Sequence, residues 1–421
     1  ERKRKIMMTM ISVFIRSDYK TMWHVPARWI NKDRLDKPAI LIANHSSFVD
    51  LMVMIGSSNK LLLVTNDWVW NSPLFGFFIR YVEYIHARDE TSFDLEKIKK
   101  KVDEGYSILI FPEGTRSKNG KVGRFKKGAF YLAEQLNLDI LPVVLHGIHH
   151  ALRKGDFSVQ KSMMTIKYLP RISTSDKTYG TGYSERAKTI SKYFKSEYAK
   201  IKLEVETADF FADKVQRLYE YKGPVLEWYV RMKMMLEKNF IEIVERVPRE
   251  GKIYDLGCGY GYLSHLLAMQ SLDREVEGLD YDQEKILVAS NSHYMEGNLH
   301  FEQCDLTQFQ PEEASCFIIK DVLHYMPAAE QKVLLNRCGA KLLSGGTIII
   351  RDGIEDESEK HGVTKMTEFF STKLFGFNKT EYELEFLPED RVLSFANEFN
   401  LGVERLENKA SSNVTYILQK S

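Results

Sequence analysis

Ile253-Tyr-Asp-Leu-Gly-Cys-Gly-Tyr-Gly261 is the stretch that decides the fold of the second half of this 421-residue chain. An apolar strand pattern ends there in a G-x-G-x-G loop, and a helical pattern follows. Glycines permit a tight turn and let a ligand approach the backbone closely. Asp280 ends the next strand pattern, 19 residues after Gly261, where nucleotide-binding α/β folds place a ribose-binding carboxylate. The stretch therefore predicts a nucleotide-type site at the edge of a parallel sheet.

Strand and helix patterns alternate through the rest of this half. We expect strands over 252–256, 275–279, 299–303, 317–320 and 347–351, and a terminal hairpin over 402–406 and 414–419. This alternation predicts a Rossmann-like, doubly wound sheet with a terminal antiparallel hairpin. A helical lead-in over 207–246, expected as a helix pair divided at Gly223 and Pro224, precedes the sheet.

The first half has the pattern of another α/β domain. Short aliphatic strands are expected over 37–43, 107–111 and 140–145, and a long closing helix is expected over about 184–204. A chain of this length suits two domains, each with its own core. We place the boundary near residue 206, which gives domains over 1–206 and 207–421.

Asn44-His-Ser-Ser-Phe-Val-Asp50 directly follows the first of these strands. A histidine with a carboxylate five residues later can form a pair in which the carboxylate orients the ring and the ring accepts a proton from a hydroxyl. Ser47-Phe-Val-Asp50 also fits a helix capping box, a purely structural alternative. The spacing alone leaves both interpretations open.

Four blocks of the first half occur in a defined order. They are the Asn-His-x4-Asp block, Val82-Glu-Tyr-Ile-His-Ala-Arg88, Phe111-Pro-Glu-Gly-Thr-Arg-Ser117 and Leu141-Pro-Val-Val144. With these blocks, about residues 20–205 resemble the glycerolipid acyltransferase family of the lysophosphatidic acid type. The resemblance implies that His45 deprotonates an acceptor hydroxyl, that Asp50 holds the His45 ring, and that the acyl donor is a thioester of coenzyme A or acyl carrier protein.

The resemblance also implies a binding site for a lipid-like acceptor, often a phosphate, because arginines bind phosphate bidentately and glycines expose backbone N–H groups. One departure bears on its specificity. Many relatives have a lysine before the second block, where this chain has Thr65-Asn-Asp-Trp-Val-Trp70, so the acceptor need not be lysophosphatidic acid. The acceptor-binding residues implied are Arg88, Glu113, Gly114, Thr115 and Arg116.

About residues 215–421 resemble class I methyltransferases that use S-adenosylmethionine (SAM), because the D-x-G-x-G loop differs from the G-x-G-x-x-G loop of dinucleotide folds. The resemblance places His324 beside the methyl acceptor, either as a general base for a phenolic hydroxyl or as a histidine with satisfied structural hydrogen bonds. It leaves O- and C-methylation open. The SAM-binding residues implied are Asp255, Gly257, Gly259, Gly261, Asp280, Tyr281, Asp305, Leu306 and Asp321.

An insertion over about 354–387 contains four phenylalanines and predicts an apolar lid over a non-polar methyl acceptor. They are Phe369, Phe370, Phe375 and Phe377. The four cysteines form no C-x-x-C pair, so we expect buried, reduced thiols and no metal site. These cysteines are Cys258, Cys304, Cys316 and Cys338.

The net charge of +1 conceals an uneven distribution. Residues 1–206 carry 35 basic and 22 acidic side chains, a balance of +13, whereas the rest of the chain carries 24 and 36, a balance of −12. The basic half is expected to touch an anionic membrane surface rather than nucleic acid. Ile6–Ile15 is apolar and flanked by basic residues but is too short to span a membrane, so it predicts a helix lying on one.

Tryptophans support the same peripheral membrane contact, because their rings concentrate at membrane interfaces. The alternative for each ring is an ordinary place in the core. The four tryptophans in question are Trp23, Trp29, Trp68 and Trp70. We expect the protein at the cytoplasmic face of a bacterial inner membrane.

The order of the two domains, joined by Tyr221-Lys-Gly-Pro-Val-Leu-Glu-Trp-Tyr229, resembles the soluble tail of bacterial trifunctional proteins. In these, an RND-type (MMPL) lipid exporter precedes an acyltransferase and a methyltransferase, often beside aryl-polyene or flexirubin-type pigment genes. The start at Glu1 rather than Met agrees with a piece of a longer chain. The implied partners are a fused or neighbouring exporter and acyl carrier protein. The alternative is a membrane-tethered methyltransferase whose first half is a lipid-binding scaffold.

Overall fold

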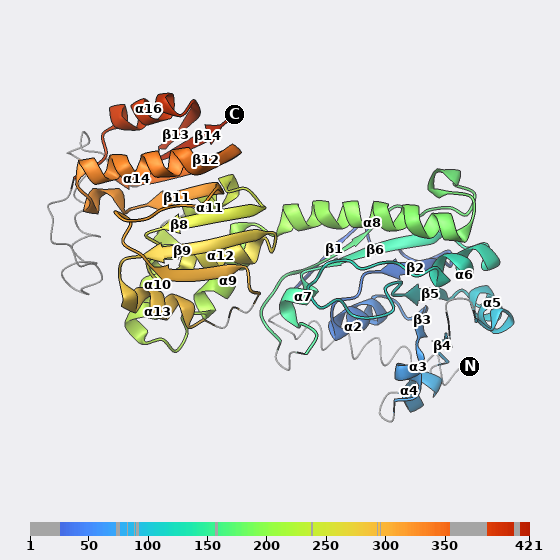
Figure 1. The fold of residues 1–421 in the computed structure, drawn as a ribbon. Helices are drawn as coiled ribbons and strands as arrows, with labels where there is room; N and C mark the ends of the chain where they lie inside the picture. Colours follow the sequence, from blue (N-terminus) through green and yellow to red (C-terminus); the bar gives the residue numbers. More distant parts are fainter. Residues whose placement is uncertain are drawn as a thin grey trace. The chain divides into compact units, whose positions relative to one another are not determined.

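The computed structural model describes residues 26–353 and 385–421, except 73–75, 82, 88, 90–91, 156–158, 237–238, 293, 295 and 408–412. The chain divides into two compact units, Glu1–Val205 and Glu206–Ser421. Each unit is built on a seven-stranded sheet with helices packed on it (Figure 1). Two α/β units in this order confirm the predicted fold class.

The sheet of the first unit has the strand order β1-β7-β6-β2-β5-β3-β4. The neighbours β6, β2, β5, β3 and β4 are parallel, whereas β7 is antiparallel to β6, and β1 is parallel to β7. Parallel strands bring their carboxyl ends to one edge, where a site can form. The strands are β1 (Ala27–Ile30), β2 (Ile40–Ala43), β3 (Leu61–Thr65), β4 (Ile85–His86), β5 (Ser107–Ile110), β6 (Ile140–His146) and β7 (Met164–Tyr168).

Helices cover this sheet through apolar faces. In α8 the core contacts come from Ala187, Ile190, Phe194 and Ile201, at the spacing that the sequence predicted. The central strands β2 and β5 are buried along their whole length. The helices are α2 (Phe48–Ser57), α3 (Asp67–Trp70), α4 (Gly76–Tyr81), α5 (Leu95–Asp103), α6 (Gly128–Leu136), α7 (Ile148–Ala151), the 3-10 helix η1 (Lys177–Tyr179) and α8 (Tyr183–Val205).

The sheet of the second unit has the order β10-β9-β8-β11-β12-β14-β13. The first five strands in this order are parallel, and β14 is antiparallel to both β12 and β13, which gives the predicted hairpin. The chain order reverses between β8 and β11, and ligands of such sheets bind at this point. The strands are β8 (Gly251–Leu256), β9 (Arg274–Asp280), β10 (Leu299–Gln303), β11 (Ala314–Lys320), β12 (Leu342–Gly353), β13 (Leu401–Glu407) and β14 (Asn413–Lys420).

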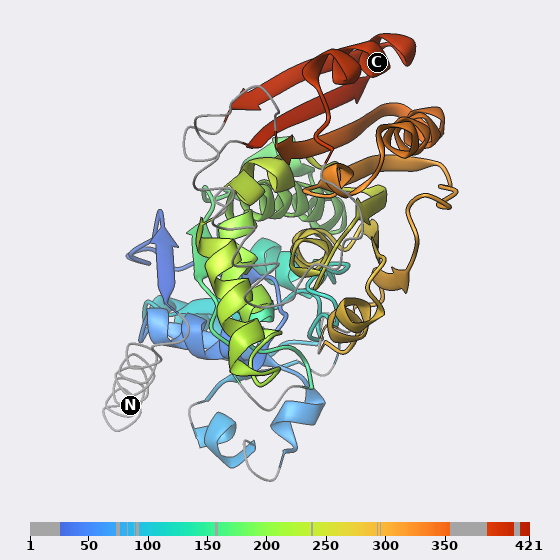
Figure 2. The same cartoon turned by 90° about the vertical axis from the view of Figure 1, so that its left-hand side faces the viewer.

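Helices lie on both faces of this second sheet (Figure 2). Alternate residues of β11 face opposite ways: Cys316 and Ile318 join the core under α9 to α12, and Phe317 and Ile319 join the core under α14 and α16. The helices are α9 (Ala208–Arg217), α10 (Pro224–Leu236), α11 (Asn239–Arg246), α12 (Tyr262–Gln270), α13 (Gln283–Ser290), the 3-10 helix η2 (Leu323–Tyr325), α14 (Ala328–Lys341) and α16 (Glu389–Glu398).

The lead-in to the second sheet is helical, as the sequence predicted. Its described residues form α9, α10 and α11. Gly223, with φ +101°, and Pro224 divide α9 from α10 as expected. The residues between α10 and α11, 237–238, lie outside the described residues.

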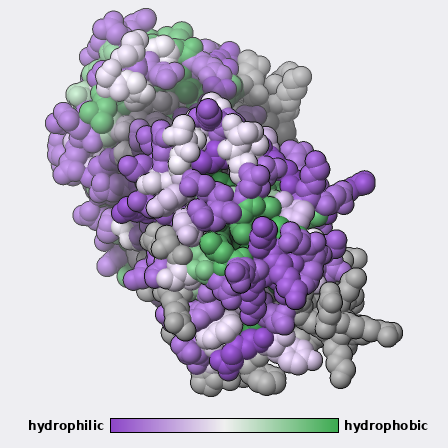
Figure 3. All heavy atoms as spheres, turned by 90° about the vertical axis from the view of Figure 1, so that its right-hand side faces the viewer, coloured by the Kyte–Doolittle hydropathy of each residue, from purple (hydrophilic) through white to green (hydrophobic). Residues whose placement is uncertain are grey.

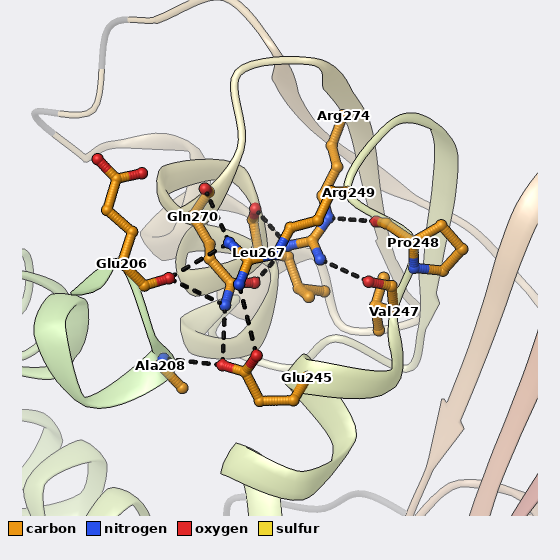
Figure 4. A network of polar contacts seen from close by, with 9 residues as sticks. All are labelled: Glu206, Ala208, Glu245, Val247, Pro248, Arg249, Leu267, Gln270 and Arg274. Carbon is orange, nitrogen blue, oxygen red and sulfur yellow. Dashed lines mark hydrogen bonds and ion pairs between the residues drawn. The ribbon is translucent and has the colours of Figure 1, made fainter. Parts of the chain in front are cut away.

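A buried arginine ties this lead-in to the sheet (Figure 4). Arg274 of β9 is 1% exposed and donates to the carbonyls of Val247, Pro248 and Leu267 at 2.8, 2.6 and 2.9 Å. It also donates to the Gln270 side chain, which in turn reaches the Glu245 carboxylate at 3.1 Å. Because each of its three nitrogens donates to a backbone or amide oxygen, the cation is held by these four hydrogen bonds without a carboxylate among their acceptors. Burial lowers the pKa of Arg274 to about 10.

Several predictions about the surface fall on residues that the structure does not describe. Ile6–Ile15, Trp23, Phe369, Phe370, Phe375 and Phe377 lie outside the described residues, as does the side chain of Trp68. Within the described part, no helix is both long and apolar enough to cross a membrane. One face of the molecule is mostly hydrophilic, with a few hydrophobic patches (Figure 3).

Two predictions about individual side chains need correction or refinement. Cys304 is only half-buried, because β10 is the edge strand of its sheet, whereas the other three cysteines are buried. Trp29 lies 6.3 Å from the Tyr168 ring, and Trp70 stacks on His86 at 4.5 Å. Both tryptophans therefore pack at least partly against neighbouring rings.

Candidate active sites

The first candidate site begins at the end of β2, where His45 and Asp50 meet. The His45 Nδ1 lies 3.0 Å from the Asp50 Oδ2, and the same oxygen accepts the backbone N–H groups of Ser46 and Ser47 at 2.5 and 2.7 Å. Ser47 is the N-cap of α2, and the capping box is present. The two interpretations of this stretch are therefore both realised, because one fully buried carboxylate caps the helix and orients the ring.

The geometry defines the tautomer of His45. An ionised carboxylate only accepts hydrogen bonds, so Nδ1 carries the proton and Nε2 keeps a lone pair. The ring also stacks on Phe111, with centroids 4.2 Å apart. These contacts fix the ring plane, and Nε2 is the nitrogen that can accept a proton.

Glu113 joins the second loop of this site to the first. Its Oε1 accepts the backbone N–H of His45 at 2.8 Å, and its Oε2 accepts that of Gly123 at 2.7 Å. The backbone N–H of Ser117 also donates to the His45 carbonyl at 2.8 Å. Burial raises the pKa of Glu113 against these two hydrogen bonds. Glu113 thus holds the histidine loop and the Phe-Pro-Glu-Gly-Thr-Arg-Ser loop together.

The remaining predicted acceptor-binding residues lie around the same turn. Gly114 has φ +69°, a conformation that favours glycine, and a Cβ there would come within 2.9 Å of Lys126 Cε. Gly114 and Thr115 are exposed, and Arg116 is half-buried. Arg88 lies outside the described residues, and in the sequence it comes two residues after β4 ends at His86. The turn after Glu113 therefore presents backbone, a hydroxyl and a guanidinium beside the histidine loop.

Asn44 is a structural residue of this site that sequence reasoning did not single out. Its side chain donates to the Leu145 carbonyl at 2.9 Å and accepts the Leu145 N–H at 2.8 Å. It is 3% exposed. An asparagine directly before the histidine, facing a strand 101 residues away, pins the β2 end to β6.

The second candidate site follows the carboxyl edge of the parallel strands. In the sheet order, β10 is followed by Asp305 and Leu306, β9 by Asp280 and Tyr281, β8 by the glycine loop, and β11 by Asp321 and His324. All the predicted cofactor-binding residues and the predicted acceptor residue thus share one edge. The order reversal between β8 and β11 lies at its centre.

The glycine loop needs glycine at each of its three positions. Gly257, Gly259 and Gly261 have φ +76°, +57° and +77°. A Cβ at Gly257 would lie 1.9 Å from Val322 Cγ2, and one at Gly261 would lie 2.5 Å from the Phe301 ring, whereas above Gly259 there is open space. This open backbone at the switch point fits the close approach of a cofactor.

Asp280 connects the loop to the next strand. Its Oδ2 accepts the Gly259 N–H at 2.7 Å, and its Oδ1 accepts the Asp282 N–H at 2.9 Å. Each carboxylate oxygen has a further lone pair, so both can still accept ribose hydroxyls. Asp280 is half-exposed, and Tyr281 beside it is 67% exposed.

Asp255 lies below the loop and is 2% exposed. The Ser264 hydroxyl donates to its Oδ2 at 2.5 Å. Burial raises the pKa of Asp255 to about 6, although the Ser264 hydroxyl and the nearby Lys320 oppose this rise. Asp255 therefore fixes the helix after the glycine loop onto the end of β8.

The other predicted cofactor residues differ in their surroundings. Asp305 is exposed, and its Oδ1 accepts the N–H and hydroxyl of Thr307 at 2.9 and 2.8 Å, while Leu306 is buried. Asp321 has φ +56°, uncommon for a non-glycine residue, and lies 3.1 Å from both Lys320 Nζ and Arg351 Nη1. A strained backbone position held by two cations thus begins the stretch that the sequence predicted beside the methyl acceptor.

His324 has a carboxylate partner that sequence reasoning missed. Its Nδ1 lies 2.5 Å from the Asp352 Oδ1, and its backbone N–H donates to the Asp352 Oδ2 at 3.1 Å. Both side chains are at most 5% exposed. An acidic residue two positions after the apolar Ile348-Ile-Ile350 of the next strand was the available signal. With Nδ1 bound to a carboxylate, Nε2 is the nitrogen that would accept a proton.

Two family models match the chain, one in each unit. Residues 22–146 match the model described as Acyltransferase, and residues 253–346 match the model described as Methyltransferase domain. The chain joins an acyltransferase domain to a methyltransferase domain. Each match covers less than half of the chain.

Individual known proteins are similar to one domain or the other. Over 164 residues the chain is 33% identical to a 1-acyl-sn-glycerol-3-phosphate acyltransferase of Limnanthes douglasii, covering 37% of this chain and 58% of that protein. Thus the chain spans less than two thirds of this relative. The acyltransferase PlsC of Thermotoga maritima is 23% identical with a TM-score of 0.41, covering 48% and 83% of the two chains. Magnesium protoporphyrin IX methyltransferase of Synechocystis PCC 6803 is 17% identical with a TM-score of 0.34, covering 51% and 98%.

Proposed function

We propose that this bifunctional transferase moves an acyl group from a thioester to a hydroxyl and methylates an apolar, hydroxylated acceptor with SAM. The observation that carries the acyl-transfer half is the His45–Asp50 pair in an acyltransferase domain. The second half rests on the glycine loop, Asp280 and the His324–Asp352 pair in a methyltransferase domain.

The acyl transfer proceeds through His45. Its Nε2 takes the proton of the acceptor hydroxyl while the oxygen attacks the thioester carbonyl carbon. Asp50 stabilises the imidazolium that forms, because its Oδ2 already accepts the Nδ1 proton. When the tetrahedral intermediate collapses, the C–S bond breaks and the thiolate takes the proton from His45. An ester and a free thiol leave.

The acceptor lies along the turn that Glu113 holds against His45. Arg116 and the backbone N–H groups near Gly114 offer positive charge to a phosphate of the acceptor. Arg88 has the same role by resemblance. Glu113 serves as a positioning residue, because both of its oxygens already bind backbone N–H groups of the chain.

SAM, when bound, supplies the methyl group. The residues present fit it: Gly259 leaves open space for its approach, Asp280 and Tyr281 would hold the ribose end, and Asp305 and Leu306 would lie by the adenine. On the acceptor side, His324 takes the proton of the acceptor hydroxyl at Nε2, and Asp352 stabilises the resulting cation. This pair favours O-methylation.

The test compares acyl transfer and methylation in one preparation. Thiol release from acyl-CoA or acyl carrier protein thioesters should fall at least about 10²-fold in His45→Ala, while methyl transfer from labelled SAM remains. Asp352→Asn should show the reverse pattern. Near-wild-type thiol release by His45→Ala would exclude His45 as the general base. Methyl transfer without any thiol release by the wild type would instead favour the scaffold alternative, in which the first domain only binds lipid.

The setting we propose is lipid or aryl-polyene-type metabolism at a bacterial inner membrane, beside a fused or neighbouring lipid exporter. Its support is the order of the two domains and the basic first half. Affinity purification of the full-length protein from its natural host, followed by identification of the gene product's complete sequence, tests the exporter fusion directly.

A further inference from the structure

A second histidine–carboxylate pair lies in the acyltransferase unit, away from His45. The His86 Nε2 of β4 lies 2.7 Å from the Asp67 Oδ1 at the start of α3. The Trp70 ring stacks on the His86 ring, with centroids 4.5 Å apart and planes 10° apart. Asp67 is 60% exposed and His86 is 20% exposed, so solvent or a ligand reaches both. An anionic side chain (Asp67), an imidazole (His86) and an apolar ring (Trp70) are thus joined in one group by a hydrogen bond and a ring stack.

The hydrogen bond decides what this group can bind. Because the carboxylate only accepts, the proton in this hydrogen bond is on Nε2, which makes Nδ1 the acceptor nitrogen of the neutral form of the ring. Asp67 and His86 then both present acceptor atoms, and the negative charge of Asp67 repels a terminal phosphate. Hydroxyl groups donate hydrogen bonds to such atoms, and the Trp70 ring adds an apolar wall.

Asp67 and His86 lie at the same edge of the sheet as His45. The parallel strands lie in the order β2, β5, β3, β4. His45 and Asp67 come two residues after β2 and β3 end, His86 is the last residue of β4, and Arg116 lies in the loop after β5, six residues beyond its end. Neighbouring strands are about 4.8 Å apart, so Asp67 follows a strand roughly 10 Å from the one that precedes His45. The loop that contains Arg116 therefore follows a strand that lies between the strands leading to His45 and to Asp67 (Figure 1 shows these strands side by side).

We propose that Asp67, His86 and Trp70 select the head group of the acyl acceptor, and that this head group carries hydroxyls beyond a phosphodiester. This rests on the proposed acyl transfer. An acceptor of this class sets its reacting hydroxyl at His45, its phosphodiester at Arg116 and its distal hydroxyls at Asp67 and His86. Lysophosphatidic acid, which ends in a phosphate monoester, would place two negative charges towards Asp67.

The experiment uses the full chain and three lysolipids with one acyl chain in common. These are lysophosphatidylglycerol, lysophosphatidylethanolamine and lysophosphatidic acid, whose heads end in hydroxyls, an ammonium and a phosphate. Turnover is measured in the wild type as kcat/KM for each acceptor. Equilibrium binding is measured in His45→Ala, which separates recognition from chemistry.

We expect kcat/KM to be about tenfold higher or more for lysophosphatidylglycerol than for lysophosphatidic acid. This is the size of effect expected from one hydrogen bond between a hydroxyl and the charged Asp67 carboxylate. Asp67→Lys should reverse this preference, and His86→Phe should reduce it. Asp103→Lys, which makes the same charge change on the exposed end of α5, is the matched control and should leave the ratio unchanged.

The outcomes separate the two proposals. The head-group assignment would be overturned by any of three results. The wild type could prefer lysophosphatidic acid, it could prefer the ammonium head group, or Asp67→Lys could affect all three lysolipids equally. Head-group discrimination in binding without turnover of any lysolipid would support the assignment and reject the proposed acyl transfer. Trp70→Ala provides a second variant if Asp67→Lys fails to fold.

Discussion

At the scale of single residues, Asp50 carries two functions on one oxygen. Its Oδ2 accepts the N–H groups of Ser46 and Ser47 and the Nδ1 proton of His45. The first two bonds start α2, and the third sets the tautomer of the base. A substitution that keeps the shape but changes the hydrogen bonding can therefore separate stability from catalysis.

Asp50→Asn should lower acyl transfer by about 10²-fold or more, because an amide can leave His45 in the wrong tautomer. Ser47→Ala removes only the serine side of the cap, which accepts from Val49 at 3.3 Å, and should cost about 1 kcal/mol of stability with little loss of rate. Thiol-release kinetics and urea denaturation measure the two effects. If Ser47→Ala lost as much rate as Asp50→Asn, the capping box alone would explain this stretch.

Asp280→Ala should weaken SAM binding without unfolding the protein, because it removes the acceptors for the ribose and frees the Gly259 N–H. Calorimetric titration with SAM measures the change in Kd. The matched control is Asp282→Ala, which removes the N-cap of α13 and leaves the Asp280 carboxylate in place. An unchanged Kd in Asp280→Ala would mean that this carboxylate does not bind the ribose.

At the scale of elements, the sequence predicts strands and loops well where a buried strand runs straight into a chemical motif. The strands before His45, Glu113 and Gly257 were all expected from their apolar runs. Sequence analysis did not identify β1, β3, β4 and β7. β4 has only two residues, and β7 is antiparallel to β6, which a βα alternation does not suggest.

The sequence could not predict the two histidine–carboxylate pairs whose members follow different strands. Asp352 meets His324 because β12 lies next to β11, and Asp67 meets His86 because β3 lies next to β4. Neither pair has a short spacing in the sequence, unlike His45 and Asp50. Only the strand order brings such residues together.

Helix α12 contains a buried histidine whose titration should affect the stability of the second unit. The His265 Nδ1 lies 2.7 Å from the Gly261 carbonyl oxygen, and its Nε2 lies 2.8 Å from the Ser292 hydroxyl. Burial lowers the pKa of His265 from 6.5 to about 4. Between these values the unfolded state binds more protons than the folded state, so the free energy of unfolding decreases as the pH falls.

This loss should amount to about 2 kcal/mol between pH 7 and pH 5, and His265→Gln should remove it. Asp255, with a raised pKa, acts in the opposite direction, so the informative quantity is the difference between the wild type and the variant. Urea unfolding can be followed by reaction of the buried Cys316 and Cys338, which report on the second unit alone. Parallel pH profiles for the two proteins would contradict the neutral, buried histidine.

At the scale of the whole molecule, the two units differ in charge. Residues 1–206 carry a balance of +13 and residues 207–421 a balance of −12. We expect the first fragment to bind anionic liposomes in a salt-sensitive way and the second to stay in solution, because anionic surfaces attract clustered lysines and arginines within a Debye length. Co-sedimentation at low and high salt measures this, with neutral liposomes as the control. Release of both fragments from anionic liposomes at low salt would reject the membrane contact.

From the fusion we predict that both domains act on the same apolar compound, such as an aryl or polyene acyl chain, so that the product of one domain is a substrate of the other. Joining two sites raises the effective concentration of one product at the other site, but only when the product can use both. The insertion over 354–387 contains four phenylalanines, and burying one aromatic ring of an acceptor contributes about 1.5–3 kcal/mol. A small polar acceptor would gain nothing from the apolar lid that the sequence predicts for these residues.

Labelled SAM should therefore be consumed with phenolic acyl thioesters or their acyl-transfer products, and not with small polar metabolites. The measurement is label incorporation by the full chain, with Asp280→Ala as the control that removes SAM binding. His45→Ala adds a second comparison. If both domains act on the same compound, this variant should still methylate a phenolic thioester. It should no longer yield a product that is both methylated and esterified. Methylation confined to small polar molecules would show that the two domains serve unrelated substrates, even with both of them active.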